Sequence, residues 1–219
     1  MLKLVIFDMD GLMFDTEEVM CRAFLEVTRE NGYPGNRDHF MNIIGLNSSD
    51  IQEKYRQYFG PDVDAAGLYR MGGERKIRII REEGIPVKKG LFSLLFALDR
   101  LGLKKAVASS SDEGMIRDNL KRAGILDRFD LIMSTRDFER GKPYPDIFLT
   151  VCEKLKVEPR EALVLEDSAN GVEAAVAGGI PVIQIPDLVT LPASLEKKCY
   201  AIRPSLDQVI PLLDELSRG

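Results

Sequence analysis

The chain has 219 residues, of which 45% are hydrophobic and 30% charged, a composition typical of a globular enzyme with one core domain and a small second unit. Its net charge of -5 argues against a nucleic-acid-binding protein, because affinity for a phosphate backbone depends on an excess of Lys and Arg. The three cysteines, Cys21, Cys152 and Cys199, have neither disulfide-framework nor C-x-x-C spacing, and no stretch has the length of a signal peptide or membrane span. We therefore expect a cytoplasmic protein that binds neither nucleic acid nor membrane, with a monomer as the default.

Short and almost purely apolar segments recur along the chain and predict strands that are buried on both faces of a parallel sheet. These segments are Leu2–Phe7, Lys105–Ala108, Leu131–Met133, Ala162–Leu165 and Val182–Ile185. Segments of helical periodicity lie between them, such as Gly90–Leu101, where apolar residues recur at i, i+3, i+4 and i+7. This alternation predicts an α/β fold, with a doubly wound and mostly parallel sheet of Rossmann-like type.

Residues 16–84 interrupt the alternation of strands and helices. They contain three stretches of helical length, at 17–31, 49–58 and 65–83, but no convincing buried strand. The simplest interpretation is a small helical domain inserted after the first strand, while residues 1–15 and 85–219 form the α/β core domain. Asp15 and Glu18 have the spacing of a capping box at the start of the first inserted helix.

Two acids, Asp8 and Asp10, follow the first predicted strand in the sequence Asp8-Met9-Asp10-Gly11. Ligands of open α/β sheets bind at the carboxyl ends of strands, so these acids lie where a site is expected. Two carboxylates in one tight turn repel each other unless a cation binds, and Mg²⁺ prefers such oxygen ligands. The alternative is that both are turn residues only, since Asp and Gly favour loops.

The ends of the second and third predicted strands carry groups that suit an anion. The second strand is followed by Ser109–Asp112, whose hydroxyl and N–H groups at a helix N-terminus form a potential anion site, although Ser111 could simply cap the helix. After the third strand, Lys142 lies on a loop just before Pro145, which is suited to open a helix. A lysine there could neutralise both a substrate phosphate and Asp8.

The fourth predicted strand is followed directly by Glu166 and Asp167. Two unpaired acids next to a buried strand would be costly, and a metal ion would relieve that cost. Ser168 is then expected to cap the following helix. Four strand ends thus carry an acid, a hydroxyl, a lysine and an acid, which together indicate a site for a metal ion and an anion.

The arrangement resembles the haloacid dehalogenase superfamily of phosphohydrolases over essentially the whole chain. The four motifs of that superfamily are similar to Asp8–Gly11, Ser109, Lys142 and Glu166-Asp167. Residues 141–146 and 165–168 are close to the versions seen in the β-phosphoglucomutase-like subgroup, and the insertion at 16–84 lies where that subgroup carries its helical cap.

The resemblance implies a Mg²⁺-dependent phosphatase that acts on a small phosphorylated metabolite, a sugar phosphate or nucleoside monophosphate, through an aspartyl phosphate. Asp8 would be the nucleophile and Asp10 the general acid and base. The metal would be held by Asp8, the Asp10 backbone carbonyl, Asp167 and, through water, Glu166. The phosphoryl oxygens would be held by Ser109, Ser110 and Lys142. An acid at position 10 also excludes the dehalogenase branch of the superfamily.

Two alternatives remain open at this stage. The mutases of this subgroup hold a second phosphate with a cap histidine and a cap arginine, but this chain has Met20 at the histidine position and no positive charge in the loop around Gly45, Asn47 and Ser48. We therefore predict hydrolysis rather than a mutase reaction. We also expect this loop and the helix near Arg70–Arg78 to contact the substrate. A non-catalytic metabolite-binding protein on the same fold is the other alternative, although it would have no use for clustered acids.

Overall fold

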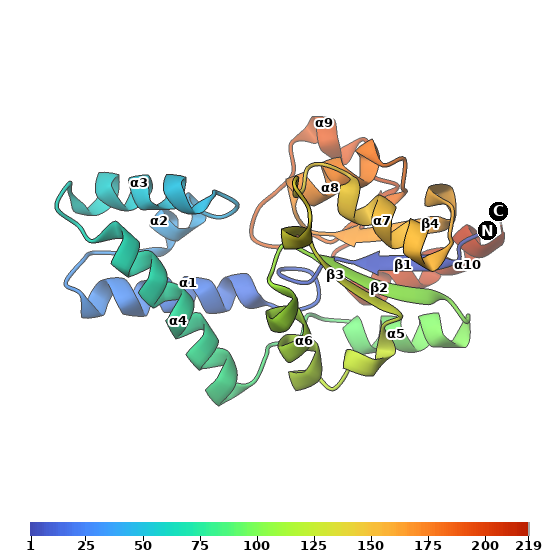
Figure 1. Cartoon of the computed structure of the whole chain (residues 1–219), viewed down its shortest axis with the longest axis horizontal. Coiled ribbons are helices and arrows are strands. Elements are labelled where there is room, and N and C mark those ends of the chain that lie inside the picture. The colour runs from blue at the N-terminus through green and yellow to red at the C-terminus, as the bar shows by residue number, and fades with distance from the viewer. Residues whose placement is uncertain (219) are drawn as a thin grey trace. The chain divides into compact units, whose positions relative to one another are not determined.

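The computed structural model describes residues 1–218 and contains two compact units (Figure 1). One unit is formed by Met1–Phe14 together with the chain from Val87 onward, and the other by Asp15–Pro86. Each unit has its own buried apolar side chains. Within the described range, no helix has both the length and the apolar character needed to span a membrane.

The first unit is built on a six-stranded sheet in which all neighbouring strands are parallel. The strands are β1 (Leu4–Phe7), β2 (Lys104–Ser109), β3 (Leu131–Ser134), β4 (Ala162–Glu166), β5 (Val182–Gln184) and β6 (Ala201–Ile202). Their order is β3-β2-β1-β4-β5-β6. The strands that follow β1 in the chain are thus added first on one side of it and then, from β4 onward, on the other, so the strand order reverses between β1 and β4. The predicted α/β fold is confirmed; β6 has only two residues and lacks an apolar segment that could have predicted it.

Helices cover both faces of this sheet. The α-helices of the unit are α5 (Leu91–Arg100), α6 (Glu113–Arg122), α7 (Asp146–Leu155), α8 (Ala169–Ala177), α9 (Ala193–Glu196) and α10 (Ile210–Arg218). Short 3₁₀ turns are η1 (Leu126–Arg128), η2 (Thr135–Asp137), η3 (Pro159–Glu161) and η4 (Leu206–Val209). Apolar residues of α7 and α8 pack against the sheet face that includes Leu4 and Ile6, and α5 and α6 lie on the other side (Figure 1).

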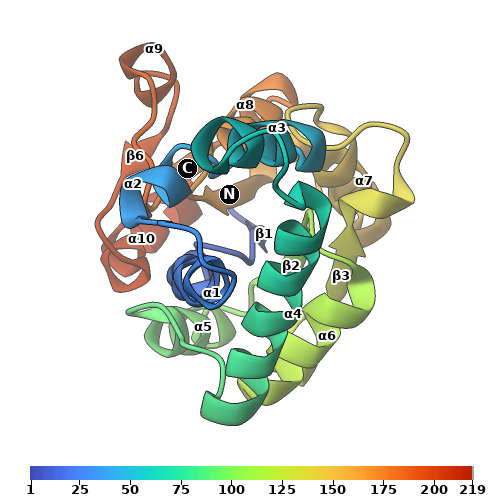
Figure 2. The same ribbon diagram turned by 90° about the vertical axis from the view of Figure 1, so that its left-hand side faces the viewer.

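The second unit, the inserted unit, is entirely helical. It consists of α1 (Thr16–Glu30), α2 (Arg37–Met41), α3 (Ser48–Phe59) and α4 (Ala65–Glu83). Figure 2 shows α1 end-on with α4 crossing beside it. The ring of Phe24 on α1 lies 5.7 Å from that of Tyr55 and 5.9 Å from that of Phe40, and the Arg22 guanidinium donates two hydrogen bonds to the Glu83 carboxylate of α4. The interpretation of this unit as a substrate cap stays a proposal.

One local prediction, the capping box at the start of α1, is wrong. Asp15 is the N-cap residue, but its side chain forms no capping hydrogen bond, because its backbone (φ -80°, ψ 54°) lies outside the extended conformation that N-cap residues usually adopt. The Glu18 carboxylate instead accepts two hydrogen bonds of 2.7 Å from the Arg37 guanidinium of α2. Glu18 therefore joins two helices of the inserted unit rather than closing the first turn of one.

Candidate active site

The site residues gather at the carboxyl ends of β1, β2 and β4, where the order of the sheet reverses. Phe7 is paired with Val107 of β2 on one side and with Leu165 of β4 on the other. The next residue of each strand is Asp8, Ala108 or Glu166, so these three residues lie side by side at the same level of the sheet. Ligands of open α/β sheets bind at this reversal point, which is therefore the expected location of a site.

The Lys142 ammonium joins these three strands. Its Nζ donates hydrogen bonds to Asp8 Oδ1 at 2.6 Å, to Glu166 Oε1 at 2.5 Å and to the Ala108 carbonyl at 3.0 Å. An ammonium has three N–H donors, and all three are used. The side chain is only 4% exposed. Burial lowers the pKa of Lys142, but the Asp8 and Glu166 carboxylates outweigh burial and raise the pKa above its ordinary value, so the ammonium stays charged.

Glu166 is completely buried, and both of its carboxylate oxygens are occupied. Oε1 accepts from Lys142, while Oε2 accepts from the backbone N–H groups of Asp167 and Ser168 at 3.0 and 3.1 Å and from the Ser168 hydroxyl at 3.0 Å. Ser168 also caps α8 as predicted, since its Oγ accepts from the Gly171 N–H at 3.1 Å. A Cβ at Gly171 would lie 1.8 Å from Glu166 Oε1, so only glycine leaves room for this carboxylate.

Three carboxylates at the ends of β1 and β4 form an acidic cluster, in which Asp8 and Glu166 are buried and Asp167 is half-buried. Oxygen atoms of Asp8, Glu166 and Asp167 lie within 4.8 Å of one another. Burial raises the pKa of Asp8 to about 7, against the opposing effect of Lys142 and with a further contribution from the Glu166 carboxylate. Burial, followed by the neighbouring carboxylates, raises the pKa of Asp167 well above its ordinary value. One ammonium cannot balance three carboxylates, and an all-oxygen set of this kind fits a hard divalent cation.

Asp10 is not part of this cluster. Its carboxylate is instead hydrogen-bonded to a serine that follows β2. The Ser111 hydroxyl donates to Asp10 Oδ2 at 2.7 Å, and the Ser111 N–H donates to the buried Ser109 hydroxyl at 3.1 Å. Ser111 does not cap α6; Asp112 has the extended backbone of an N-cap residue and accepts from the Gly114 N–H at 2.9 Å. The Ser111 side chain is thereby left to orient Asp10, a role that the sequence did not predict.

Asp187 is a further acid beside the cluster and was also missed. It follows β5, its Oδ1 accepts from Lys88 Nζ at 2.5 Å, and its side chain is 7% exposed. A Cβ at Gly11 would lie 2.3 Å from Asp167 Oδ2 and 3.1 Å from Asp187 Oδ2, so both carboxylates face the space beside Gly11. Asp187 shares one signal with the other positions, an acid shortly after a buried strand, but that signal alone does not distinguish it from a turn residue.

The comparison with known families agrees with this geometry. The model of the haloacid dehalogenase-like hydrolase family matches residues 5–185, a range that contains Asp8, Asp10, Ser109, Lys142 and the Glu166-Asp167 pair. The chain belongs to the haloacid dehalogenase-like hydrolases. The resemblance carried by the sequence motifs is thus confirmed.

Similar proteins cover between 82% and 98% of the chain. YhcW of Bacillus subtilis (strain 168) is 31% identical over 97% of this chain and 96% of its own length. It is provisionally named a phosphatase. A phosphorylated carbohydrates phosphatase of Thermotoga maritima is 30% identical over 82% of each chain. A crystal structure from Thermotoga maritima, provisionally described as a β-phosphoglucomutase, is 26% identical and matches with a TM-score of 0.84 over 98% of this chain and 99% of that one.

The predicted substrate residues of this haloacid dehalogenase-like hydrolase lie at the start of α3. Gly45 has a left-handed backbone (φ 77°) in the loop before the helix, and Ser48 is its exposed first residue. Asn47 caps α3, because its Oδ1 accepts from the Asp50 N–H at 3.0 Å while its Nδ2 donates to Asp50 Oδ2 at 2.7 Å. Asn47 therefore has a structural role in the inserted unit, and contact of this loop with the substrate stays a prediction.

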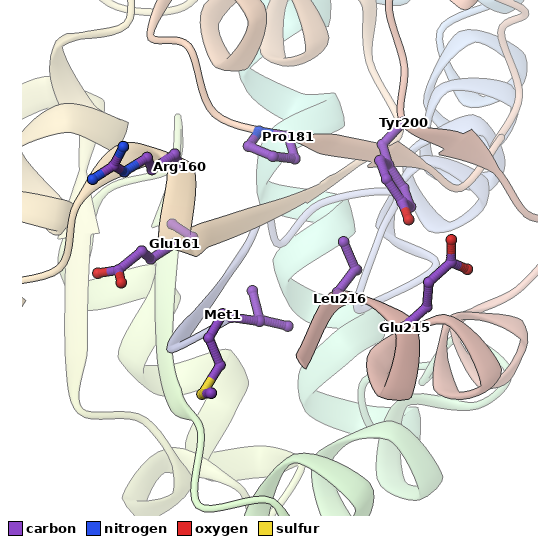
Figure 3. Close-up of a pocket in the computed structure, with 9 residues that line it drawn as sticks. Met1, Arg160, Glu161, Pro181, Tyr200, Glu215 and Leu216 are labelled. Carbon is purple, nitrogen blue, oxygen red and sulfur yellow. The ribbon is translucent and has the colours of Figure 1, made fainter. Parts of the chain in front are cut away.

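A hollow of about 600 Å³ lies elsewhere on the core unit of this hydrolase (Figure 3). Its lining consists of Met1, Leu2, Arg160, Glu161, Ala162, Pro181, Tyr200, Glu215 and Leu216. Leu2, Ala162 and Pro181 lie at or just before the amino ends of β1, β4 and β5, so the hollow is at the opposite edge of the sheet from Asp8. It is therefore separate from the site at the carboxyl ends.

Proposed function

We propose that this hydrolase is a Mg²⁺-dependent phosphatase that acts on a small phosphorylated metabolite, a sugar phosphate or a nucleoside monophosphate, through an aspartyl phosphate on Asp8. The observation that carries the proposal is that the Asp8 carboxylate has two kinds of neighbour, other carboxylates and an ammonium. Its carboxylate belongs to the acidic cluster and is at the same time paired with the Lys142 ammonium at 2.6 Å. The similarity to a phosphatase of phosphorylated carbohydrates supports the substrate class.

Asp8 is the nucleophile of the proposed reaction. A bond forms between one of its carboxylate oxygens and phosphorus while the bond from phosphorus to the leaving oxygen breaks. Lys142 favours the ionised carboxylate that this attack requires. Asp8, Asp167 and the Asp10 backbone carbonyl would hold Mg²⁺, whose charge would reduce the repulsion between the Asp8 carboxylate and a phosphate dianion.

Asp10 moves the protons of both half-reactions. It donates a proton to the leaving oxygen and then accepts one from the water molecule that hydrolyses the aspartyl phosphate. The Ser111 hydroxyl, 2.7 Å from Asp10 Oδ2, fixes the orientation of this carboxyl group. Ser111 is therefore a positioning residue for the proton transfers.

Ser109, Ser110 and Lys142 were predicted to bind the phosphoryl oxygens. Ser109 is buried at the end of β2 and Ser110 is exposed beside it. Lys142 differs from this simple assignment, because its three N–H groups are already donated to protein oxygens. We propose that Lys142 acts chiefly by compensating the charge of Asp8, and that the serine hydroxyls and nearby N–H groups bind the phosphoryl oxygens.

A phosphosugar mutase is the second candidate, supported by the similarity to the structure described provisionally as a β-phosphoglucomutase. A mutase must hold phosphate at two places in turn. Met20, at the position of the expected histidine, is half-buried beside α4, where its Cε would lie 3.2 Å from a Cβ at Gly72. With no positive side chain at Met20 or at positions 45–49, hydrolysis is the better-supported reaction.

Phosphate release from a panel of sugar phosphates and nucleoside monophosphates tests the proposal. The wild-type protein should release phosphate in the presence of Mg²⁺, and this release should stop when EDTA removes the metal ion. Asp8→Asn should reduce the rate by at least about a thousand-fold, because removal of a nucleophile abolishes its covalent route. The matched control is Asp127→Asn, at an exposed position in η1, which should retain the wild-type rate.

Three other results would contradict the proposal. Conversion of β-glucose 1-phosphate to glucose 6-phosphate, primed by the bisphosphate and faster than phosphate release, would establish the mutase instead. Absence of turnover on the whole panel, together with tight binding of one of its members, would indicate a non-catalytic binding protein. Wild-type rates for Asp8→Asn would show that Asp8 is not the nucleophile.

A further inference from the structure

Asp187 has a buried carboxylate oxygen that its surroundings do not satisfy. Its Oδ1 is paired with Lys88 Nζ at 2.5 Å, and the side chain is 7% exposed. Within residues 1–218, Oδ2 has no hydrogen-bond partner. A buried carboxylate oxygen without a donor is unfavourable and uncommon, so a donor that belongs to a bound group is expected there.

The position of Oδ2 indicates where that group would lie. A Cβ at Gly11 would be 3.1 Å from Asp187 Oδ2 and 2.3 Å from Asp167 Oδ2, so the two oxygens approach the same space from different strands. Gly11 keeps that space open because it has no side chain, and its φ of 83° disfavours any other residue. Two carboxylate oxygens that face one space repel each other unless a cation or a polarised donor lies near them.

The donor expected at this place is a water molecule bound to a cation. Asp187 is outside the set of Asp8, Glu166 and Asp167, whose oxygens lie within 4.8 Å of one another, so it does not belong to the acidic cluster that would hold the ion. Mg²⁺ usually keeps several water ligands, and those waters are strong hydrogen-bond donors that require acceptors. Partners of this kind tune metal sites, and their loss typically weakens metal binding 10–100-fold.

We propose that Asp187 is a positioning residue of the metal site: Oδ2 accepts a hydrogen bond from a metal-bound water, and the ion pair with Lys88 holds the carboxylate in place. The inference rests on the proposed function, because it requires the acidic cluster to bind a divalent cation. It extends the site from the ends of β1 and β4 to the loop after β5.

Metal binding by the full-length protein, measured without substrate, tests this role. The probe is Mn²⁺, which shares the preference for oxygen ligands and is followed by the loss of its free-ion EPR signal; Mg²⁺ is then measured by competition. Asp187→Asn should raise both dissociation constants about 10–100-fold. Lys88→Met, which removes the anchor, should weaken binding less, and the exposed control Asp127→Asn should leave both constants unchanged.

The melting temperature of the metal-free protein separates this role from a purely structural one. The inference predicts that Asp187→Asn folds and that the Mg²⁺-induced rise in melting temperature is reduced. A purely structural ion pair with Lys88 predicts a lower melting temperature without metal and unchanged metal affinity, and that result would overturn the inference while leaving the proposed function intact. Failure of the wild-type protein to bind either ion would overturn both.

Discussion

Lys142 and Asp8 are joined at 2.6 Å at the end of the central strand, and this contact determines the electrostatics of the site. The same ammonium bonds to Glu166, so one buried cation compensates two carboxylates from adjacent strands. Removing one partner of such a pair leaves buried charge uncompensated, which typically costs about 3–5 kcal/mol. The contact therefore links the stability of the core unit to the chemistry proposed for it.

Lys142→Met should destabilise the protein more at high pH than at low pH. At pH 8 the Asp8 and Glu166 carboxylates lose their cation, and we expect a loss of about 3 kcal/mol in the free energy of unfolding. At pH 5 the Asp8 carboxyl group, whose pKa burial raises to about 7, can take up a proton instead, so the loss should be smaller. Urea unfolding in EDTA at both pH values measures the difference. Equal losses at the two pH values would contradict the role given to Lys142.

In the metal-free protein, the contribution of Asp8 to the free energy of unfolding should decrease as the pH rises. The folded-state pKa of Asp8 is raised from 3.8 to about 7, so the folded protein binds a proton that the unfolded chain releases near pH 4. The stabilising contribution is complete below about pH 4 and is lost as the pH rises through about 7. Urea unfolding in EDTA between pH 5 and 8 should show a negative slope that Asp8→Asn reduces. Parallel slopes for the two proteins would contradict the prediction.

The strand-end residues could be predicted because parallel strands bring their carboxyl ends to one edge of the sheet. Asp8 and Asp167 needed only the recognition of apolar segments and of the acids that follow them. Lys142 lies further along the loop after β3, and its assignment depended also on the resemblance to the haloacid dehalogenase superfamily. Asp187 could not be separated from an ordinary turn residue, because its partner Lys88 lies 99 positions earlier in the chain. Ser111 was ambiguous for a different reason, since its place before a helix suited both a helix cap and an anion site, and its bond to Asp10 becomes visible only in the structure.

Ser111→Ala should affect catalysis, whereas Asp112→Ala should affect mainly stability. Loss of the hydroxyl that holds Asp10 should lower kcat by about ten-fold and displace the pH–rate profile, because the proton-transfer group is no longer oriented. Loss of the Asp112 cap should cost about 1 kcal/mol of stability with kcat retained. Steady-state kinetics and urea unfolding of both variants test this division. A kcat for Ser111→Ala equal to that of wild type would show that Ser111 does not position Asp10.

Gly171→Ala should damage the site even though alanine favours helix formation. Its Cβ would lie 1.8 Å from Glu166 Oε1 and would displace the carboxylate that anchors Lys142. The matched control is Gly73→Ala in α4, where a Cβ meets nothing within 4 Å and helix propensity should add up to about 1 kcal/mol of stability. Phosphatase assays and thermal unfolding compare the pair. Full activity of Gly171→Ala would refute the packing argument for Glu166.

Direct detection of the phosphorylated enzyme tests the central claim most sharply. Asp10→Asn, in which hydrolysis of the intermediate is slowed, is mixed with the best substrate and Mg²⁺, quenched in acid and digested for mass spectrometry. The account predicts one phosphoryl group on the peptide that contains Asp8, and its absence from the Asp8→Asn/Asp10→Asn double variant. Turnover without any phosphorylated peptide, or a phosphoryl group on another residue, would contradict it.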